Sequence, residues 1–286
     1  MSLRVYYQLT KPGIIYGNAL PLIAGFLLAS KRHIDLLLLL MVLVGASLVI
    51  ASGCVFNNWL DRGIDRKMAR TQHRALAQGT IPGRNAIAYA VLLAAAGFTL
   101  LLVYTNVLVV VVGATGLIDY IVLYGFAKRH SVHGTLVGSI AGATPPLAGY
   151  LAVTDHVDLT ALLLFLILAV WQMPHFYAIA LYRLKDYRAA GLPVLPVKKG
   201  LRATKISIVA YIVAFTACCV ALSLSGHASH IFLVIMLAAG LWWLWPAIKG
   251  FVAADSTSSW ARGLFLRSLV VLCVYCTVMG LNVVLP

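Results

Sequence analysis

Nine apolar runs, each about twenty residues long, follow one another along this chain of 286 residues. They lie at roughly 14–30, 36–58, 85–104, 106–126, 134–153, 159–182, 204–225, 229–248 and 263–285. Each is long enough to cross about 30 Å of hydrocarbon as an α-helix, and the strand-like alternation that a membrane barrel requires is not seen. Because 62% of the residues are hydrophobic and only 10% are charged, a water-soluble surface is excluded. The sequence predicts an all-α polytopic membrane protein, and with no Pro/Gly/Ser linker to divide it, residues 1–286 are expected to form one domain.

The charge distribution predicts the orientation. With a cytoplasmic N-terminus, the segments before the first run and after each even-numbered run share one face and hold 18 of the 22 Lys and Arg residues, and Lys205 and Arg267 lie near that face at the start of the seventh and ninth runs. The opposite face has only Lys31 and Arg32. By the positive-inside rule, the chain is expected in the cytoplasmic (inner) membrane, with its long charged loops in the cytoplasm and its C-terminus outside. The net charge of +14 then reflects topology and contact with anionic lipid or substrate, and no nucleic-acid partner is expected.

Two cytoplasmic loops, at about 59–84 and 183–203, are more than twenty residues long and densely charged. At the start of the first, Asn57, Asp61 and Asp65 fall at positions i, i+4 and i+8, within about 80° of one helical face. Four arginines repeat this spacing one residue later: Arg62, Arg66, Arg70 and Arg74. If the helix continues past the membrane edge, a carboxylate and amide stripe runs beside a guanidinium stripe.

This spacing fits two interpretations. One is a set of i,i+4 ion pairs that ends a helix among the lipid headgroups. The other is a site for Mg²⁺, which takes oxygen ligands and commonly bridges to phosphates, with guanidinium groups on the phosphate oxygens. All eight acids of the chain are Asp, so the position of each one is informative.

The other cytoplasmic segments add further charges. In the second long loop, Asp186 is the sole acid among five cations that include Lys185, and its spacing fits a local salt bridge or a metal ligand. A third segment places Lys128 and Arg129 after Tyr124. Three loops on one face therefore offer acids, cations and a phenol.

Four stretches resemble a known family: TKPGIIYGN (10–18), ASGCVFNNWLDRGIDRKMARTQHR (51–74), KRHSVHGTLVGSIAGATPPLAGY (128–150) and WQMPHFYAIALYRLKDYRAAGLPVLPVKKG (171–200). The N-x-x-x-D-x-x-x-D pattern is similar to the first Asp-rich motif of the UbiA-type intramembrane prenyltransferases. WQMPHFYAI and GATPPLAGY resemble their protoheme IX farnesyltransferase (heme O synthase) branch. Two departures are visible: Ala75 stands where the family usually has Pro, and Tyr182 and Asp186 stand where the superfamily has a second pair of Asp residues.

The resemblance implies a nine-helix bundle around a central cavity capped by the long loops. It implies transfer of farnesyl from farnesyl diphosphate to a vinyl group of heme B, with addition of water, to give heme O. Asn57, Asp61, Asp65 and Asp186 are the expected ligands of one or two Mg²⁺ ions, and Lys128 the expected catalytic cation. The expected substrate-binding residues are Arg62, Arg66, Arg70, Arg74, Tyr124, Arg129, Tyr182, Lys185, Asn18, His175 and Trp171.

Two polar residues inside predicted spans remain open. His175 fits either a heme contact or a hydrogen bond to a neighbouring helix, and Asp119 is expected to bond a Tyr or Asn across helices. Two other functions also remain open: prenylation of an aromatic quinone precursor, and anion transport. Beyond farnesyl diphosphate, heme B and the bilayer, the expected partners are membrane proteins of the heme pathway or of oxidase assembly.

Overall fold

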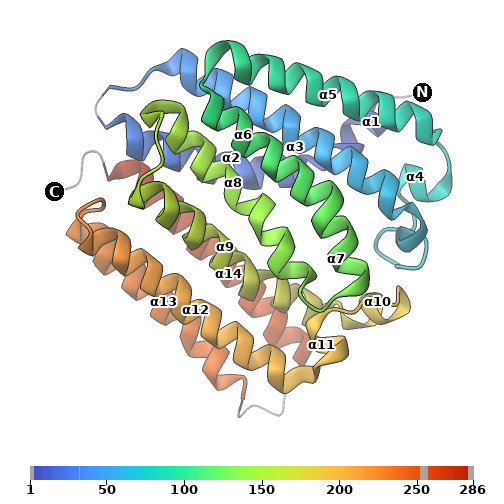
Figure 1. Ribbon diagram of the computed structural model, residues 1–286. Coiled ribbons are helices and arrows are strands. Elements are labelled where there is room, and N and C mark those ends of the chain that lie inside the picture. The colour runs from blue at the N-terminus through green and yellow to red at the C-terminus, as the bar shows by residue number, and fades with distance from the viewer. Residues whose placement is uncertain (1–2, 32, 252–256, 283–286) are drawn as a thin grey trace.

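The computed structural model describes residues 3–31, 33–251 and 257–282. Its helices are α1 (Leu3–Leu9), α2 (Pro12–Ser30), α3 (Leu36–Asp65), α4 (Ala75–Gln78), α5 (Gly83–Tyr104), α6 (Val107–Ile118), α7 (Tyr124–His130), α8 (Gly134–Thr154), α9 (Leu159–Tyr182), α10 (Leu184–Ala189), α11 (Leu195–Lys198), α12 (Gly200–Leu224), α13 (His230–Lys249) and α14 (Thr257–Leu281), with a π-helical turn over Asp119–Leu123 that joins α6 to α7 (Figure 1). No strand occurs in these described ranges.

Nine helical segments within the described residues are long and apolar enough to cross a membrane. The predicted all-α fold and the predicted number of spans are confirmed. Helix ends differ where charged residues continue a helix beyond its apolar run: α3 ends at Asp65 and not near residue 58, and α14 begins at Thr257 and not near residue 263. Two parts of the predicted topology, Arg32 and the last four residues of the chain, lie outside the described residues.

Four spanning helices begin with a side-chain cap at the end of the bundle away from the long loops. Asp35, Asn106, Asp158 and Ser229 accept hydrogen bonds from the backbone N–H three residues later, at 2.9, 3.1, 2.8 and 3.2 Å. Such caps satisfy backbone donors that a helix leaves free in its first turn. They fix the residues at which α3, α6, α9 and α13 begin.

The opposite end of the bundle carries the long loops. In Figure 1, α4, α10 and α11 lie along one edge of the molecule, next to the ends of α3 and α7. The two long loops therefore share a face, as their positions after even-numbered spans predict.

Glycines allow the helices around the central cavity to pack closely. A Cβ atom added at Gly149 of α8 would lie 2.1 Å from the carbonyl oxygen of Leu22 in α2, and one at Gly25 would lie 2.2 Å from that of Pro146. Without an apolar driving force between helices in lipid, such small-residue contacts are the usual way to bring backbones together. They hold α2, and the loop that precedes it, against α8.

Asp119 has a different partner from the one expected. Its Oδ2 accepts a hydrogen bond from the backbone N–H of Ala141 in α8 at 3.1 Å, so the bond crosses helices but the donor is not a Tyr or Asn side chain. Its Oδ1 is buried and has no hydrogen-bond partner among the described residues.

Candidate active site

A cavity of about 690 Å³ lies between α2, α3, α6, α7, α8, α9 and α14, with one side chain from α5. Its body is lined by apolar side chains, among them Val49, Leu101, Leu168 and Leu272. Its polar side chains include seven that come from the loop end of the bundle: Lys11, Asn57, Asp61, Asp65, Arg70, Arg74 and Lys128. The space therefore suits a ligand with a charged head and a long apolar body.

The last turns of α3 place the predicted acidic motif at the cavity. Asn57, Asp61 and Asp65 all line it, and they are 4%, 9% and 5% exposed. The i, i+4, i+8 spacing puts them on one face because α3 stays helical through Asp65. Buried carboxylates require compensating charges, and the surrounding elements supply them.

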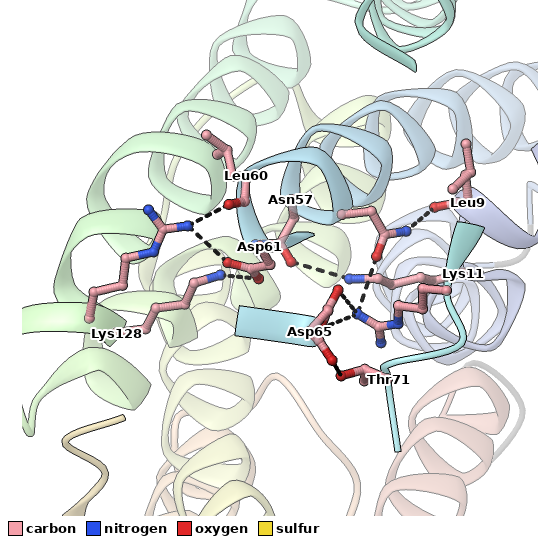
Figure 2. A network of polar contacts seen from close by, with 11 residues as sticks. Leu9, Lys11, Asn57, Leu60, Asp61, Asp65, Thr71 and Lys128 are labelled. Atoms are coloured by element: carbon pink, nitrogen blue, oxygen red, sulfur yellow. Dashed lines mark hydrogen bonds and ion pairs between the residues drawn. The ribbon is translucent and has the colours of Figure 1, made fainter. Parts of the chain in front are cut away.

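Asp61 is held by two cations from α7. Lys128 Nζ donates to Asp61 Oδ2 at 2.5 Å, and Arg129 Nη2 donates both to Asp61 Oδ1 at 3.1 Å and to the Leu60 carbonyl at 2.9 Å. Figure 2 shows Lys128 reaching Asp61 from the side opposite Lys11. The partners come from an element more than sixty residues away in the sequence, and they are not the arginines near Asp61 in the chain.

Asp65 is held by the loop that follows it. Arg74 Nη1 lies 2.9 Å from Asp65 Oδ2 and also donates to Asn58 Oδ1 at 3.2 Å. The Thr71 hydroxyl donates to the Asp65 carbonyl at 3.1 Å, which turns the chain back at the end of α3. Asn58 donates in turn to the Leu9 carbonyl at 2.8 Å, so α1 is fastened to the same cluster.

Lys11 lies at the site, although its sequence context did not predict it. It lies just before α2 with a left-handed backbone (φ 51°), a conformation that costs a non-glycine residue energy and is often found at functional positions. Its Nζ donates to Asn57 Oδ1 at 3.2 Å and is paired with no carboxylate among the described residues. Burial lowers the pKa of Lys11 to about 8, so an arriving anion would favour its charged form. The signal in the sequence is a lone lysine before the Pro-Gly that opens the first span.

The predicted stripe of four arginines does not form. Because α3 ends at Asp65, the later arginines follow turns instead of the helical period. Arg62 folds back on the Trp59 carbonyl (2.7 Å), and Arg66 donates to the Ala77 carbonyl (2.6 Å). Neither lines the cavity, whereas Arg70 and Arg74 do. Arg62 and Arg66 thus lie outside the cavity wall, and their role in substrate binding stays a prediction.

The second long loop reaches the cavity through residues other than those predicted. Tyr182, Arg183 and Tyr187 line it, and Lys185 and Asp186 do not. Burial raises the pKa of Tyr187, with Arg70 close enough to oppose that shift, so its phenol remains a hydrogen-bond donor. The structure thus does not bring Asp186 together with Asp61 and Asp65 in the cavity wall.

Aromatic side chains from α7 and from the π-helical turn before it line the same end of the cavity. The Tyr124 ring lies 4.9 Å from Lys128 Nζ and stacks on Tyr120 at 5.6 Å between centroids. Tyr124 fits here because Gly138 of α8 has no side chain: a Cβ there would lie 2.7 Å from the ring. A cation next to a ring face is stabilised by the ring quadrupole.

His175 lies in the cavity wall on α9, and it hydrogen-bonds to a neighbouring helix. Its Nδ1 is 2.7 Å from the Ser268 hydroxyl of α14, and its ring stacks on Trp171 at 4.9 Å. Trp171 donates through Nε1 to the Ser268 carbonyl at 3.0 Å. With Nδ1 occupied, Nε2 is the ring nitrogen left to contact a ligand, because it has no hydrogen bond to the described residues. Asn18 of α2 also lines the cavity.

The polar end of the cavity, next to the long loops, is called its mouth below. The oxygen atoms there suit Mg²⁺ only in combination with a phosphate ligand. No group of three His, Cys, Asp or Glu side chains is gathered in the described part of the chain. Mg²⁺ is commonly held by one or two carboxylates together with substrate phosphates and water. Asn57, Asp61 and Asp65 supply oxygen atoms of that kind at one end of the cavity, so the residues fit such an ion.

An all-helical membrane bundle with an apolar cavity and a mouth of acids and cations defines a class of intramembrane enzymes whose substrates have a charged head and an apolar body. The chain matches the model of the UbiA prenyltransferase family over residues 18–269. It belongs to that family and is a prenyltransferase.

Named relatives and solved structures agree with this assignment. The protoheme IX farnesyltransferase of Klebsiella pneumoniae is 49% identical over 98% of this chain and 95% of its own length. A structure of digeranylgeranylglyceryl phosphate synthase in membranes superposes with a TM-score of 0.81 at 17% identity, covering 99% of this chain and 98% of its own. A UbiA homolog from Archaeoglobus fulgidus bound to GPP and Mg²⁺ has a TM-score of 0.73 at 18% identity, covering 96% and 99%. At these identities the two structures establish the fold.

Proposed function

We propose that this protein transfers the farnesyl group of farnesyl diphosphate to a vinyl group of heme B, with addition of water, to make heme O and release diphosphate. The observation that carries the proposal is the cavity with an acid-and-cation mouth and an apolar body, together with relatives named protoheme IX farnesyltransferase.

The diphosphate would bind at the mouth. Five cations face two carboxylates there: Lys11, Arg70, Arg74, Lys128 and Arg129 against Asp61 and Asp65. Guanidinium and ammonium groups donate charge-assisted hydrogen bonds to phosphate oxygens. The excess of positive charge favours an anionic head, and neither Lys11 nor Arg70 is paired with a carboxylate in the part of the chain that the structure describes.

Asn57, Asp61 and Asp65 would hold one or two Mg²⁺ ions on that diphosphate. The cations now paired with the two carboxylates, Lys128, Arg129 and Arg74, would then turn to the phosphate oxygens. Bound Mg²⁺ would supply neutralisation of the leaving diphosphate. A role for Asp186 in metal binding remains a prediction, and it requires α10 to move because this side chain lies outside the cavity wall.

Heterolysis of the allylic C–O bond leaves the electron pair on diphosphate and a delocalised farnesyl cation. Cationic side chains at the mouth stabilise the departing charge, and the apolar wall keeps water from the cation until the acceptor reacts. The vinyl π electrons then form the new C–C bond. Water adds to the cation generated beside the porphyrin and loses a proton, which leaves a hydroxyethylfarnesyl group. No nucleophilic side chain is required.

Lys11→Met is expected to raise the KM for farnesyl diphosphate about tenfold or more and to lower kcat less, because it removes one charge-assisted hydrogen bond to the head group. Initial rates in detergent with labelled farnesyl diphosphate measure the effect. The matched control is Lys67→Met, an exposed lysine of the first long loop that does not line the cavity. An unchanged KM in the Lys11 variant would remove this residue from the site.

His175→Ala is expected to weaken heme binding about tenfold and to shift the Soret band, because the Ser268 contact leaves Nε2 available to the heme iron. Heme titration of the purified protein measures both. Ser268→Ala, which frees the ring to rotate, should give a smaller change of the same sign. His227→Ala, in an exposed turn at the other end of the bundle, should change neither. An unaltered band and affinity would exclude ligation by His175.

The acceptor is tested directly by expressing the protein and extracting its pigments. Mass analysis should find a heme enlarged by farnesyl and water. Offering labelled farnesyl diphosphate with heme B or with an aromatic acid in parallel separates the two prenyltransferase assignments. Product with the aromatic acid alone would replace the present proposal, and diphosphate transport without chemistry would indicate a carrier.

We further propose that the protein lies in the cytoplasmic (inner) membrane, with the long loops in the cytoplasm and the C-terminus outside. The distribution of Lys and Arg supports this orientation. Heme would then enter and leave by way of the bilayer or of other membrane proteins of the heme pathway and of oxidase assembly.

A further inference from the structure

Arg267 is a cation in the first half of the membrane-spanning helix α14, and it is paired with no anion of the described residues. It follows the start of α14 by ten residues, about 15 Å along the helix axis. Its guanidinium carbon lies 5.4 Å from the centroid of the Trp242 ring on α13. Its Nη1 extends back toward Gly263, one turn nearer the start of α14. Charged side chains within membrane spans are costly and usually have a function.

An apolar groove begins at this pair. Four residues of α13 and three of α14 line it: Ile235, Ala238, Ala239, Trp242, Val270, Val271 and Val274. Its volume is about 330 Å³. Arg267 comes one turn before Val270 and Val271 on the same stripe of α14. Trp242 joins the two features, because it lines the groove and lies under the guanidinium. Val271 is fully buried at its floor, and half of the Val270 surface is exposed at its rim.

The groove is separate from the active-site cavity. α14 lines that cavity with Phe265, Leu269 and Leu272, which lie on a different face of the helix from the groove. The groove faces outward from the bundle between α13 and α14, where the bilayer would be. It therefore has no part in the proposed transfer reaction, and the inference below stands apart from it.

We propose that this groove binds one anionic phospholipid, with its phosphate on Arg267 and an acyl chain along the apolar walls. The guanidinium fork matches phosphate oxygens, and Trp rings are favoured at the level of the headgroups. α12, α13 and α14 contain no Asp or Glu, so no acid of these helices competes for Arg267. Lys249, which lies 4.7 Å from the Trp245 ring at the end of α13, adds positive charge on the same side.

The charge of the groove disfavours a second copy of this chain as its occupant. A two-fold contact through α13 and α14 would bring two unpaired Arg267 side chains toward each other. A free phosphate ion would use the guanidinium and leave the apolar walls uncovered. An anionic lipid satisfies both the cation and the walls.

Native mass spectrometry of the full-length protein in detergent tests the proposal. Phosphatidylglycerol, phosphatidylcholine with the same acyl chains, and inorganic phosphate are titrated separately. One phosphatidylglycerol should bind saturably, phosphatidylcholine more weakly, and phosphate not at all. Arg267→Gln should weaken phosphatidylglycerol binding about fivefold and remove the preference over phosphatidylcholine. Arg262→Gln, an exposed cation of α14 outside the groove, should leave both unchanged.

A second variant tests the walls and keeps the charge. Ala239→Phe fills the groove beneath Trp242 and should lower the affinity for both lipids while farnesyl transfer is maintained. If Arg267→Gln does not fold, the lipid affinities of Ala239→Phe test the proposal in its place. Equal phosphatidylglycerol affinity in the wild-type protein and the foldable variants would overturn the proposal. So would cross-linking from position 242 to another protein or to a second copy.

Discussion

Asp61→Asn is expected to reduce farnesyl transfer at least about a thousandfold. The substitution keeps the shape of the side chain but removes the charge on which Mg²⁺ binding and the placement of Lys128 both depend. Asp65→Asn should have a comparable effect through its contact with Arg74. Asp186→Asn should reduce transfer less, because Asp186 does not line the cavity. Single-turnover assays with labelled farnesyl diphosphate and heme B compare all three.

A loss of activity must be separated from a loss of fold. The side chains of Asp61 and Lys128 are only 13% and 12% exposed, and removing one partner of such a pair leaves a poorly solvated charge. We therefore expect a lower melting temperature for Asp61→Asn, with the protein still monodisperse at the assay temperature. Asp155→Asn, an exposed acid at the far end of the bundle, is the matched control. Transfer by Asp61→Asn within tenfold of the wild-type rate would contradict the assignment.

The spans were predictable from sequence because lipid imposes a strong and local requirement. A helix satisfies its backbone hydrogen bonds internally, so about twenty apolar residues suffice to define a span. The starts at Leu36, Gly134 and Leu159 coincide with the expected ones. The ends that differ, at Asp65 and Thr257, lie where polar residues prolong a helix beyond the hydrocarbon, and hydropathy gives no information there.

The site was only partly predictable, and the reason is the distance between partners along the chain. The spacing of Asn57, Asp61 and Asp65 on one helix is local, and all three line the cavity. The partner of Asp61 is 67 residues away and that of Asn57 is 46 residues away. No local period encodes either contact. This is why Lys11 was not predicted, and why Arg62 and Arg66 lie outside the cavity wall once the chain turns after Asp65.

The positions of the cations at the mouth depend on how the helices pack. Lys11 reaches Asn57 only because α2 starts where it does, and α2 is positioned against α8 by the contacts of Gly25 and Gly149. Helices at fixed distances keep a binding site preorganised, since a side chain displaced by about 1 Å can lose much of its effect. Packing far from the mouth is thus expected to affect the diphosphate site.

Gly149→Val is expected to destabilise the bundle by about 4 kcal/mol or more, or to prevent its folding. The first side-chain carbon would lie 2.1 Å from the Leu22 carbonyl oxygen and 3.0 Å from the Phe26 backbone nitrogen. These are backbone atoms, so no rotamer change relieves the overlap, and α2 must move away from α8. Thermal unfolding followed by size-exclusion chromatography in detergent measures the loss. Gly63→Ala, where a Cβ meets nothing within 4 Å, should unfold at the wild-type temperature or slightly above it. An unchanged midpoint for Gly149→Val would show that this contact does not hold α2 in place, and the position of Lys11 would then need another cause.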